Sequence, residues 1–193
     1  MHKRDFLAAA IAGTALPAAM AQPQVNALTV RGPALLTVTG AINKPNRGPL
    51  DPVLDQMMAK QKLAFDKARS FDFAALAAMP AVAIKPTLEY DRKPHTLRGP
   101  LLSTVLRAAG APHDGKLAMR AIDGYAPVIS IDDARRLRFI VATHLDGKPM
   151  PLGGLGPLWA LFDADQFPDF AARPVTERFA SCPWGLYHIA VAA

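Results

Sequence analysis

The stretch RGPLLSTVLRAAG, residues 98–110, carries the clearest secondary-structure signal in the chain. Gly99 and Pro100 precede an apolar run, and proline is favoured at the first helical position because its missing N–H would have no partner there. Gly110 follows the run, as glycine often does after the last turn of a helix. The sequence therefore predicts a helix over residues 99–109 with both of its ends defined.

On either side of this helix, short segments rich in β-branched and apolar residues are bounded by Gly, Pro, Asn or Asp, which is typical of strands. We expect strands at 28–30, 35–40, 82–84, 117–122, 126–131, 138–145, 150–152, 158–162 and 184–191. The pairs Asp123-Gly124 and Asp146-Gly147 lie between such segments and predict tight turns.

Two more helices are expected before residue 80. Asp51 is a good N-cap with Pro52 at the first helical position, and apolar residues at helical spacing extend the pattern to about Ser70. Asp72 is predicted to cap a shorter helix through Met79. Strands dominate without a strict βαβ rhythm, so we expect an α+β fold, a mixed β-sheet with interspersed helices.

The first 21 residues have the three parts of a signal peptide: charged residues 1–5, an apolar run at 6–16 and small residues at 18–21. The apolar run is too short to span a bilayer. We expect cleavage before Gln22, leaving residues 22–193 as a single domain in the periplasm or otherwise exported. Lys3-Arg4 is similar to a twin-arginine signal, so both this route and the general secretory route remain open.

The formal net charge of the chain is +6, which favours anionic small molecules or acidic protein surfaces as partners. The basic residues are scattered rather than gathered with interleaved aromatic residues, so nucleic acid is not an expected partner. Nor is the exported domain expected to be an integral membrane protein. Cys182 is the single cysteine, and we expect a buried thiol.

Common signatures of hydrolases, nucleotide-binding proteins and zinc sites do not occur in the sequence. A different pattern does occur, in four segments that follow one another in a fixed order and precede a terminal tryptophan. They are RGPLL…L…G at 98–110, AIDGYAPVI at 121–129, DGKPMPL at 146–152 and GPLW at 156–159, followed by Trp184.

In this order and spacing the pattern resembles the oxidoreductase molybdopterin-binding domain, the fold of sulfite oxidase and its bacterial relatives. The resemblance covers about residues 28–193. It implies a mixed α+β fold that holds the pterin of the molybdenum cofactor in loops between strands.

The resemblance also implies a molybdenum-binding cysteine a dozen or so residues before the predicted helix, but residues 85–91, KPTLEYD, contain none. A soft thiolate is the expected ligand, and neither Thr87 nor Glu89 has its donor properties. Cys182 could replace it only if the fold brought it to the same pocket. We therefore expect no metal, as in the small exported members of the family that bind a pterin and report it to a membrane-anchored signalling partner.

A pterin is a flat heteroaromatic ring with an amide-like edge, so its site needs a stacking plane and hydrogen-bonding groups. Arg98 and Trp184 are candidates for stacking, and Asp123 is a candidate acceptor with Tyr125 packed beside it. Tyr90 is a further candidate for the same pocket. Each also has a structural alternative: a surface arginine, a turn, or core packing. Trp159 is expected in the core.

Three functions remain open from the sequence. The first is an exported, non-catalytic pterin-binding protein that modulates a membrane-anchored partner. The second is a molybdopterin-dependent oxidoreductase of the same fold that uses Cys182 or an unfamiliar metal ligand. The third is an interaction module whose pocket is vestigial.

Overall fold

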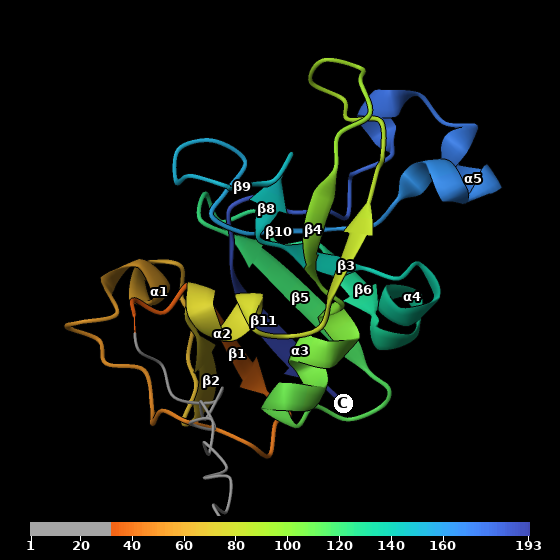
Figure 1. Ribbon diagram of the computed structural model, residues 1–193. Coiled ribbons are helices and arrows are strands. Elements are labelled where there is room, and N and C mark those ends of the chain that lie inside the picture. Colours follow the sequence, from red (N-terminus) through yellow and green to blue (C-terminus); the bar gives the residue numbers. More distant parts are fainter. Residues whose placement is uncertain (1–31) are drawn as a thin grey trace, which may run out of the picture.

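The structure is a computed structural model that describes residues 32–193. The expected signal peptide (1–21) and the expected strand at 28–30 lie outside these residues. The described chain folds into three β-sheets with short helices at their edges (Figure 1). This arrangement confirms the α+β class.

The largest sheet has the strand order β2-β1-β11-β5-β6. Its strands are β1 (Leu36–Gly40), β2 (Ala68–Phe71), β5 (Lys116–Ala121), β6 (Val128–Ser130) and β11 (Leu186–Ala192). β1 pairs with β11 in parallel, and the other pairs are antiparallel, so the sheet is mixed as expected.

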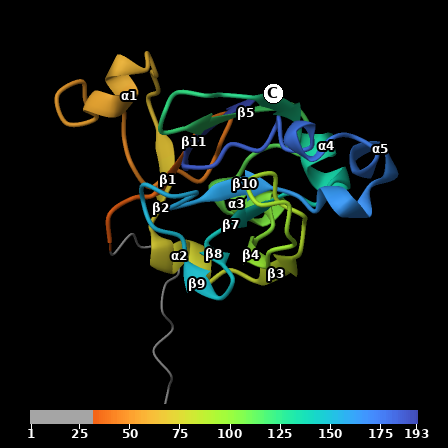
Figure 2. The ribbon, with the colours of Figure 1, turned by 90° about the horizontal axis from the view of Figure 1, so that it is seen from above.

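The second sheet is antiparallel throughout and has the order β3-β4-β8-β9. It consists of β3 (Ala81–Ile84), β4 (Leu97–Pro100), β8 (His144–Leu145) and β9 (Lys148–Pro149). A third sheet pairs β7 (Ile140–Ala142) with β10 (Trp159–Leu161). Figure 2 shows β10, β7 and α3 close together in the middle of the molecule.

The helices are short. They are α1 (Gln56–Lys60), α2 (Phe73–Ala77), α3 (Leu102–Ala109), α4 (Ile131–Arg136) and α5 (Pro168–Ala171), with 3-10 turns η1 (Ala164–Gln166) and η2 (Val175–Glu177). Among the described residues, none of these helices has the length and apolar character needed to cross a membrane.

One hydrophobic core joins the three sheets. In α3, the apolar positions of the predicted helix turn inward, where Leu102 and Val105 are fully buried. Phe139 and Phe162, from the segments next to β7 and β10, pack against each other with tilted rings whose centroids lie 5.0 Å apart. Trp159 is 1% exposed, which confirms its expected place in the core.

The predicted helix over 99–109 ends where expected but begins later. Gly110 has a left-handed φ of +73° and terminates α3. Gly99 and Pro100, however, are the last residues of β4, and the helix begins at Leu102. The reason for the glycine is a close backbone approach, because a Cβ on Gly99 would lie 1.9 Å from the carbonyl oxygen of Val141.

The predicted helix over 51–70 is wrong. Only α1 is helical in this stretch, and Leu54, one of the apolar residues at helical spacing, is 81% exposed. Lys62 has a left-handed φ of +59°, which prevents the helix from continuing. Residues 68–71 instead form β2 against β1, so pairing at the sheet edge overrides the helical spacing of the apolar residues.

Several other predicted elements are confirmed. Asp72 caps α2, its Oδ1 accepting the Ala75 N–H at 2.7 Å. Asp146 and Gly147 both have positive φ and form the turn between β8 and β9. The strand predicted at 138–145 is divided into β7 and β8, and the strand predicted at 150–152 is instead β9, at 148–149. The remaining predicted strands within the described residues agree with the structure, and most of their ends differ by no more than two residues. They correspond to β1, β3, β5, β6, β10 and β11.

Candidate functional site

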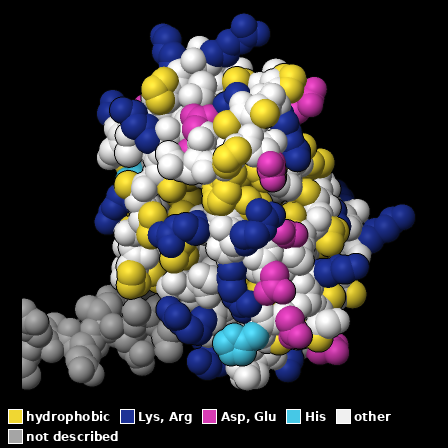
Figure 3. All heavy atoms as spheres, turned by 90° about the vertical axis from the view of Figure 1, so that its right-hand side faces the viewer, with side chains coloured by type: hydrophobic (Ala, Val, Ile, Leu, Met, Phe, Trp, Pro, Cys, Tyr) yellow, Lys and Arg dark blue, Asp and Glu magenta, His cyan; other side chains and the backbone are white. Residues whose placement is uncertain are grey.

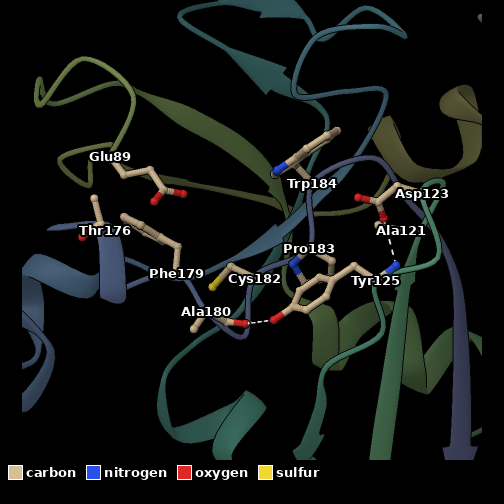
Figure 4. Close-up of a pocket in the computed structure, with 10 residues that line it drawn as sticks. All are labelled: Glu89, Ala121, Asp123, Tyr125, Thr176, Phe179, Ala180, Cys182, Pro183 and Trp184. Carbon is tan, nitrogen blue, oxygen red and sulfur yellow. Dashed lines mark hydrogen bonds between the residues drawn. The ribbon is translucent and has the colours of Figure 1, made fainter.

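A cavity of about 210 Å³ lies where three segments distant in sequence meet (Figure 4). The segments are the loop after β3, the turn between β5 and β6, and the stretch from η2 to the start of β11. The lining residues are Glu89, Ala121, Asp123, Tyr125, Thr176, Phe179, Ala180, Cys182, Pro183 and Trp184. Three of the five predicted site residues, Asp123, Tyr125 and Trp184, therefore line one cavity.

Residues 182–184 are held in place by Trp159 and its neighbour on β10. The Trp159 Nε1–H donates to the carbonyl oxygen of Cys182 at 2.9 Å, and the Ala160 N–H donates to that of Pro183 at 3.1 Å. An isolated β-bridge pairs Trp159 with Trp184. The backbone that carries Trp184 is thus fixed to the core.

The Trp184 side chain is presented at the surface rather than packed in the core. The residue is 41% exposed, and its indole lies across the upper part of the cavity in Figure 4. Core packing, the structural alternative for this residue, does not describe it. An exposed indole on a fixed backbone is a suitable plane for stacking a flat ring.

Asp123 and Tyr125 come from the turn between β5 and β6. Gly124, with φ +95°, allows the turn, and the Asp123 carboxylate accepts the Tyr125 N–H at 2.9 Å. The Tyr125 hydroxyl donates to the carbonyl oxygen of Ala180 across the cavity. This bond ties the turn to the segment before Cys182.

Tyr90 lies beside the cavity rather than in its lining. Its ring centroid is 6.4 Å from that of Trp159, and the residue is 55% exposed. Burial of its inner part and the neighbouring Glu89 carboxylate raise the pKa of the Tyr90 hydroxyl to about 12, so this hydroxyl stays protonated. Tyr90 therefore supports the rim of the pocket as a neutral donor.

Glu89 lines the cavity and was not among the predicted site residues. In the sequence, Glu89 stands where the resemblance implies a metal-binding cysteine, and no local pattern marks it as a hydrogen-bond acceptor for a ligand. Its loop is held by hydrogen bonds such as that in which the Thr87 N–H donates to the Asp165 side-chain Oδ2 at 2.7 Å. In Figure 4 its carboxylate points toward the space between Phe179 and Trp184.

Cys182 and Glu89 line the same cavity, so the fold does bring Cys182 close to the segment where the metal-binding cysteine was expected. The residue is only 4% exposed, however, and burial raises the pKa of its thiol to about 12. Its sulfur is therefore almost inaccessible to a metal from the cavity side. The residues of this cavity therefore do not fit a molybdenum centre, and Cys182 has the properties of a buried structural thiol.

Arg98 is separated from the other candidates. It lies on β4, is exposed, and does not line this cavity. Its predicted position in front of a helix N-terminus is wrong, because β4 continues to Pro100. The structure brings together Asp123, Tyr125 and Trp184, with Tyr90 at the edge, and leaves Arg98 outside.

The charge in the cavity is negative. Glu89 and Asp123 both line it, and its lining contains no Lys, Arg or His. Carboxylates accept hydrogen bonds from amino and ring N–H groups, whereas they repel phosphate. The cavity is suited to a neutral or cationic ring with donors along one edge.

A shallow apolar groove of about 450 Å³ continues from the cavity past Trp184. Asp123 and Trp184 line both spaces, and the far wall of the groove is the glycine-rich bend at 152–156. Leu152 is 73% exposed at its edge. A substituent on a ring bound in the cavity would have this apolar surface available.

No family model matches the sequence, and no curated protein matches it either. Solved structures do show a similarity. One of them is the sulfane dehydrogenase SoxCD from Paracoccus pantotrophus, with a TM-score of 0.52 and 11% sequence identity. The match covers 81% of this chain and 37% of that protein. At so low a sequence identity, the similarity shows a shared fold alone.

Proposed function

We propose that this protein binds a pterin in the cavity beside Trp184, as an exported, non-catalytic protein of the sulfite oxidase fold. The observation that carries the proposal is the convergence of a fixed, exposed indole with the carboxylates of Glu89 and Asp123. The structural similarity to SoxCD supports the fold assignment.

The residues of the cavity match the chemistry of a pterin ring. Trp184 supplies a stacking face, and Glu89 is placed to accept from the exocyclic amino group and the adjacent ring N–H. A volume of 210 Å³ is below the range of about 300–1,000 Å³ that drug-sized ligands occupy. The cavity therefore suits a single bicyclic ring, with any tail lying in the groove beside residues 152–156.

The same residues argue against the complete molybdenum cofactor. Molybdopterin carries a phosphate, which two nearby carboxylates disfavour. The only thiol of the pocket, Cys182, is 4% exposed, so its sulfur is almost inaccessible to a metal bound there. A pterin without phosphate or metal is thus favoured over the alternative of an oxidoreductase.

The proposal extends to a membrane-anchored signalling partner that senses whether the pterin is bound. Large exposed apolar side chains surround the cavity and its groove, and such clusters mark interaction surfaces. They are Tyr90, Tyr125, Leu152 and Trp184. A partner that covers this surface would contact the bound ring directly.

The test compares pterin with lumazine, in which a carbonyl oxygen replaces the exocyclic amino group. By calorimetry, we expect the wild type to prefer pterin and Glu89→Gln to lose that preference. Trp184→Ala removes the stacking face and is expected to weaken binding roughly 5- to 150-fold. Arg98→Gln is the matched control, because Arg98 lies outside the cavity, and it is expected to bind as the wild type does.

Two results would overturn the proposal. One is equal affinity of wild type and Trp184→Ala for pterin, or no binding by either, which would favour an interaction module with a vestigial pocket. The other is molybdenum at about one atom per chain in protein purified from its native compartment. Sequencing the N-terminus of that protein tests export, since we expect it to begin at Gln22.

A further inference from the structure

A second cavity, of about 450 Å³, lies between α3, α4 and the loop after β1. It shares no lining residue with the candidate pterin site. Its floor is apolar, because Leu106, Ile131 and Ala134 reach it from the buried faces of the two helices. A binding site here would be independent of the function proposed for the first cavity.

The rim of this cavity is basic. Lys44, Arg107, His113 and Arg135 line it, and none of its lining residues is acidic. Within residues 32–193, neither Lys44 nor Arg107 forms an ion pair, and Arg135 has only the exposed Asp132 at 3.2 Å. Figure 3 shows the side of the molecule that carries α4, where Lys and Arg side chains are spaced among Asp and Glu side chains.

Stabilisation of the α3 C-terminus explains only part of this arrangement. Arg107 lies in the last turn of α3, where a positive charge interacts favourably with the helix dipole. Arg135 and His113 belong to a different helix and to the loop beyond α3. Basic groups from separate segments that converge on one concave surface concentrate positive potential there.

We propose that this cleft binds small organic anions that carry a carboxylate or phosphate on an apolar ring or short chain. Lys44, Arg107 and Arg135 hold the anionic group by charge-assisted hydrogen bonds, and Ser103 and Asn43 add polar contacts at the rim. The apolar body rests on Leu106, Ile131 and Ala134.

The probe for the experiment is phenyl phosphate, with benzyl alcohol as its neutral counterpart, followed in the full chain by NMR of the backbone amides. Phenyl phosphate is expected to shift amides of residues 103–113 and 131–135, and benzyl alcohol is not. The double variant Arg107→Gln/Arg135→Gln is expected to bind phenyl phosphate at least about tenfold more weakly than the wild type does. Arg136→Gln removes one unit of charge, against two in the double variant, from α4 outside the cavity, and is expected to change affinity by about twofold at most.

Three outcomes would overturn the proposal. The first is the absence of shifts in these two segments. The second is an equal loss of affinity in Arg136→Gln, which would make the attraction a diffuse property of the surface. The third is equal affinity for inorganic phosphate, since the apolar floor would then contribute nothing. The amide spectra of the variants also report whether each one is folded.

Discussion

Trp159 connects the core to the candidate site. Its ring lies 6.2 Å from Phe179 and 6.4 Å from Tyr90, centroid to centroid, while its Nε1–H donates to the Cys182 carbonyl. The backbone bridge to Trp184 starts at the same residue. One buried side chain thus positions the aromatic ring that we propose to stack on the ligand.

Replacing Trp159 with phenylalanine tests this role. The variant keeps an aromatic ring but leaves the buried Cys182 carbonyl without its donor, which costs about 1–3 kcal/mol of unfolding free energy. We expect lower stability in urea denaturation together with weaker pterin binding. Trp184→Phe is the control, since Trp184 is half-exposed and its loss is expected to leave stability within about 0.5 kcal/mol of wild type.

The Cys182 thiol gives a second prediction at this scale. With a pKa of about 12 and 4% exposure, it has almost no reactive thiolate at pH 8. An aromatic disulfide reagent is expected to label it only after denaturant is added. Rapid labelling of the native protein would show that the thiol is accessible and would reopen its role as a ligand.

At the scale of elements, β4 and β7 approach closely because residue 99 has no side chain. A Cβ there would lie 1.9 Å from the Val141 carbonyl oxygen. The Thr143 N–H donates to the Arg98 carbonyl at 2.9 Å, and the Leu102 N–H donates to that of Phe139 at 2.8 Å. This contact joins the second and third sheets and sets where α3 begins.

Gly99→Ala is therefore expected to destabilise the protein by about 1–3 kcal/mol, because two backbones must separate. Gly48→Ala is the matched control, since its Cβ would meet nothing within 4 Å. We expect this control to stay within about 0.5 kcal/mol of wild type in denaturant titrations. Similar stability of the two variants would show that β4 and β7 can shift apart at little cost.

A histidine holds the loop that carries Glu89. His95 Nδ1 lies 2.7 Å from Asp146 Oδ2, and its Nε2 lies 2.9 Å from Asp91 Oδ2. Hydrogen bonds to Asp146 and Asp91 raise the pKa of His95 above its usual 6.5, and the same bonds lower the pKa of both aspartates below 3.8. The imidazolium donates to both carboxylates and links the loop to the turn between β8 and β9.

The contribution of this link to stability depends on pH. The raised pKa of His95 gives stability that is complete below pH 6.5 and is lost as pH rises through the folded pKa. The lowered pKa values of the aspartates give stability that is present above 3.8 and lost in stronger acid. The difference in unfolding free energy between wild type and His95→Gln is therefore expected to be largest between pH 3.8 and pH 6.5.

The measurement is a series of urea titrations from acidic to mildly alkaline pH. Buried His188, whose pKa burial lowers to about 4, makes the folded state less stable as pH falls below 6.5, but equally in both proteins. It cancels in the difference. A difference between wild type and His95→Gln that stays constant over the whole pH range would contradict the link.

At the scale of the whole molecule, the two ends of the described chain share one sheet. β1 pairs with β11 in parallel, with Thr37 opposite His188, and residues from all three sheets contribute to one core. The acidic cavity beside Trp184 and the basic cleft share no lining residue, although the chain as a whole carries +6. No described sheet could be lost without exposing part of the shared core.

We therefore expect cooperative unfolding. In Trp184→Phe, the remaining Trp159 reports on the core by fluorescence, while far-ultraviolet circular dichroism reports on the sheets. Both signals are expected to change together in a single denaturant transition. Two separated transitions would show that one sheet unfolds independently of the others.

Local patterns in the sequence determined the α+β class, the α3 C-terminus at Gly110, the Asp72 cap and the turns at 123–124 and 146–147. Each depends on a few neighbouring residues, whose backbone preferences act wherever the segment lies. Asp123, Tyr125 and Trp184, which line the candidate site, were expected from a turn and from the terminal tryptophan of the four-segment pattern, and their role in binding stays a prediction. Tertiary contacts decided the rest. Pairing with β1 made residues 68–71 a strand, and the packing of β4 against β7 moved the start of α3 to Leu102. The loop after β3 placed Glu89 in the same cavity as Cys182, whereas Arg98 lies outside it. Contacts of this kind join residues far apart in the chain, so they leave no periodic signal in the sequence.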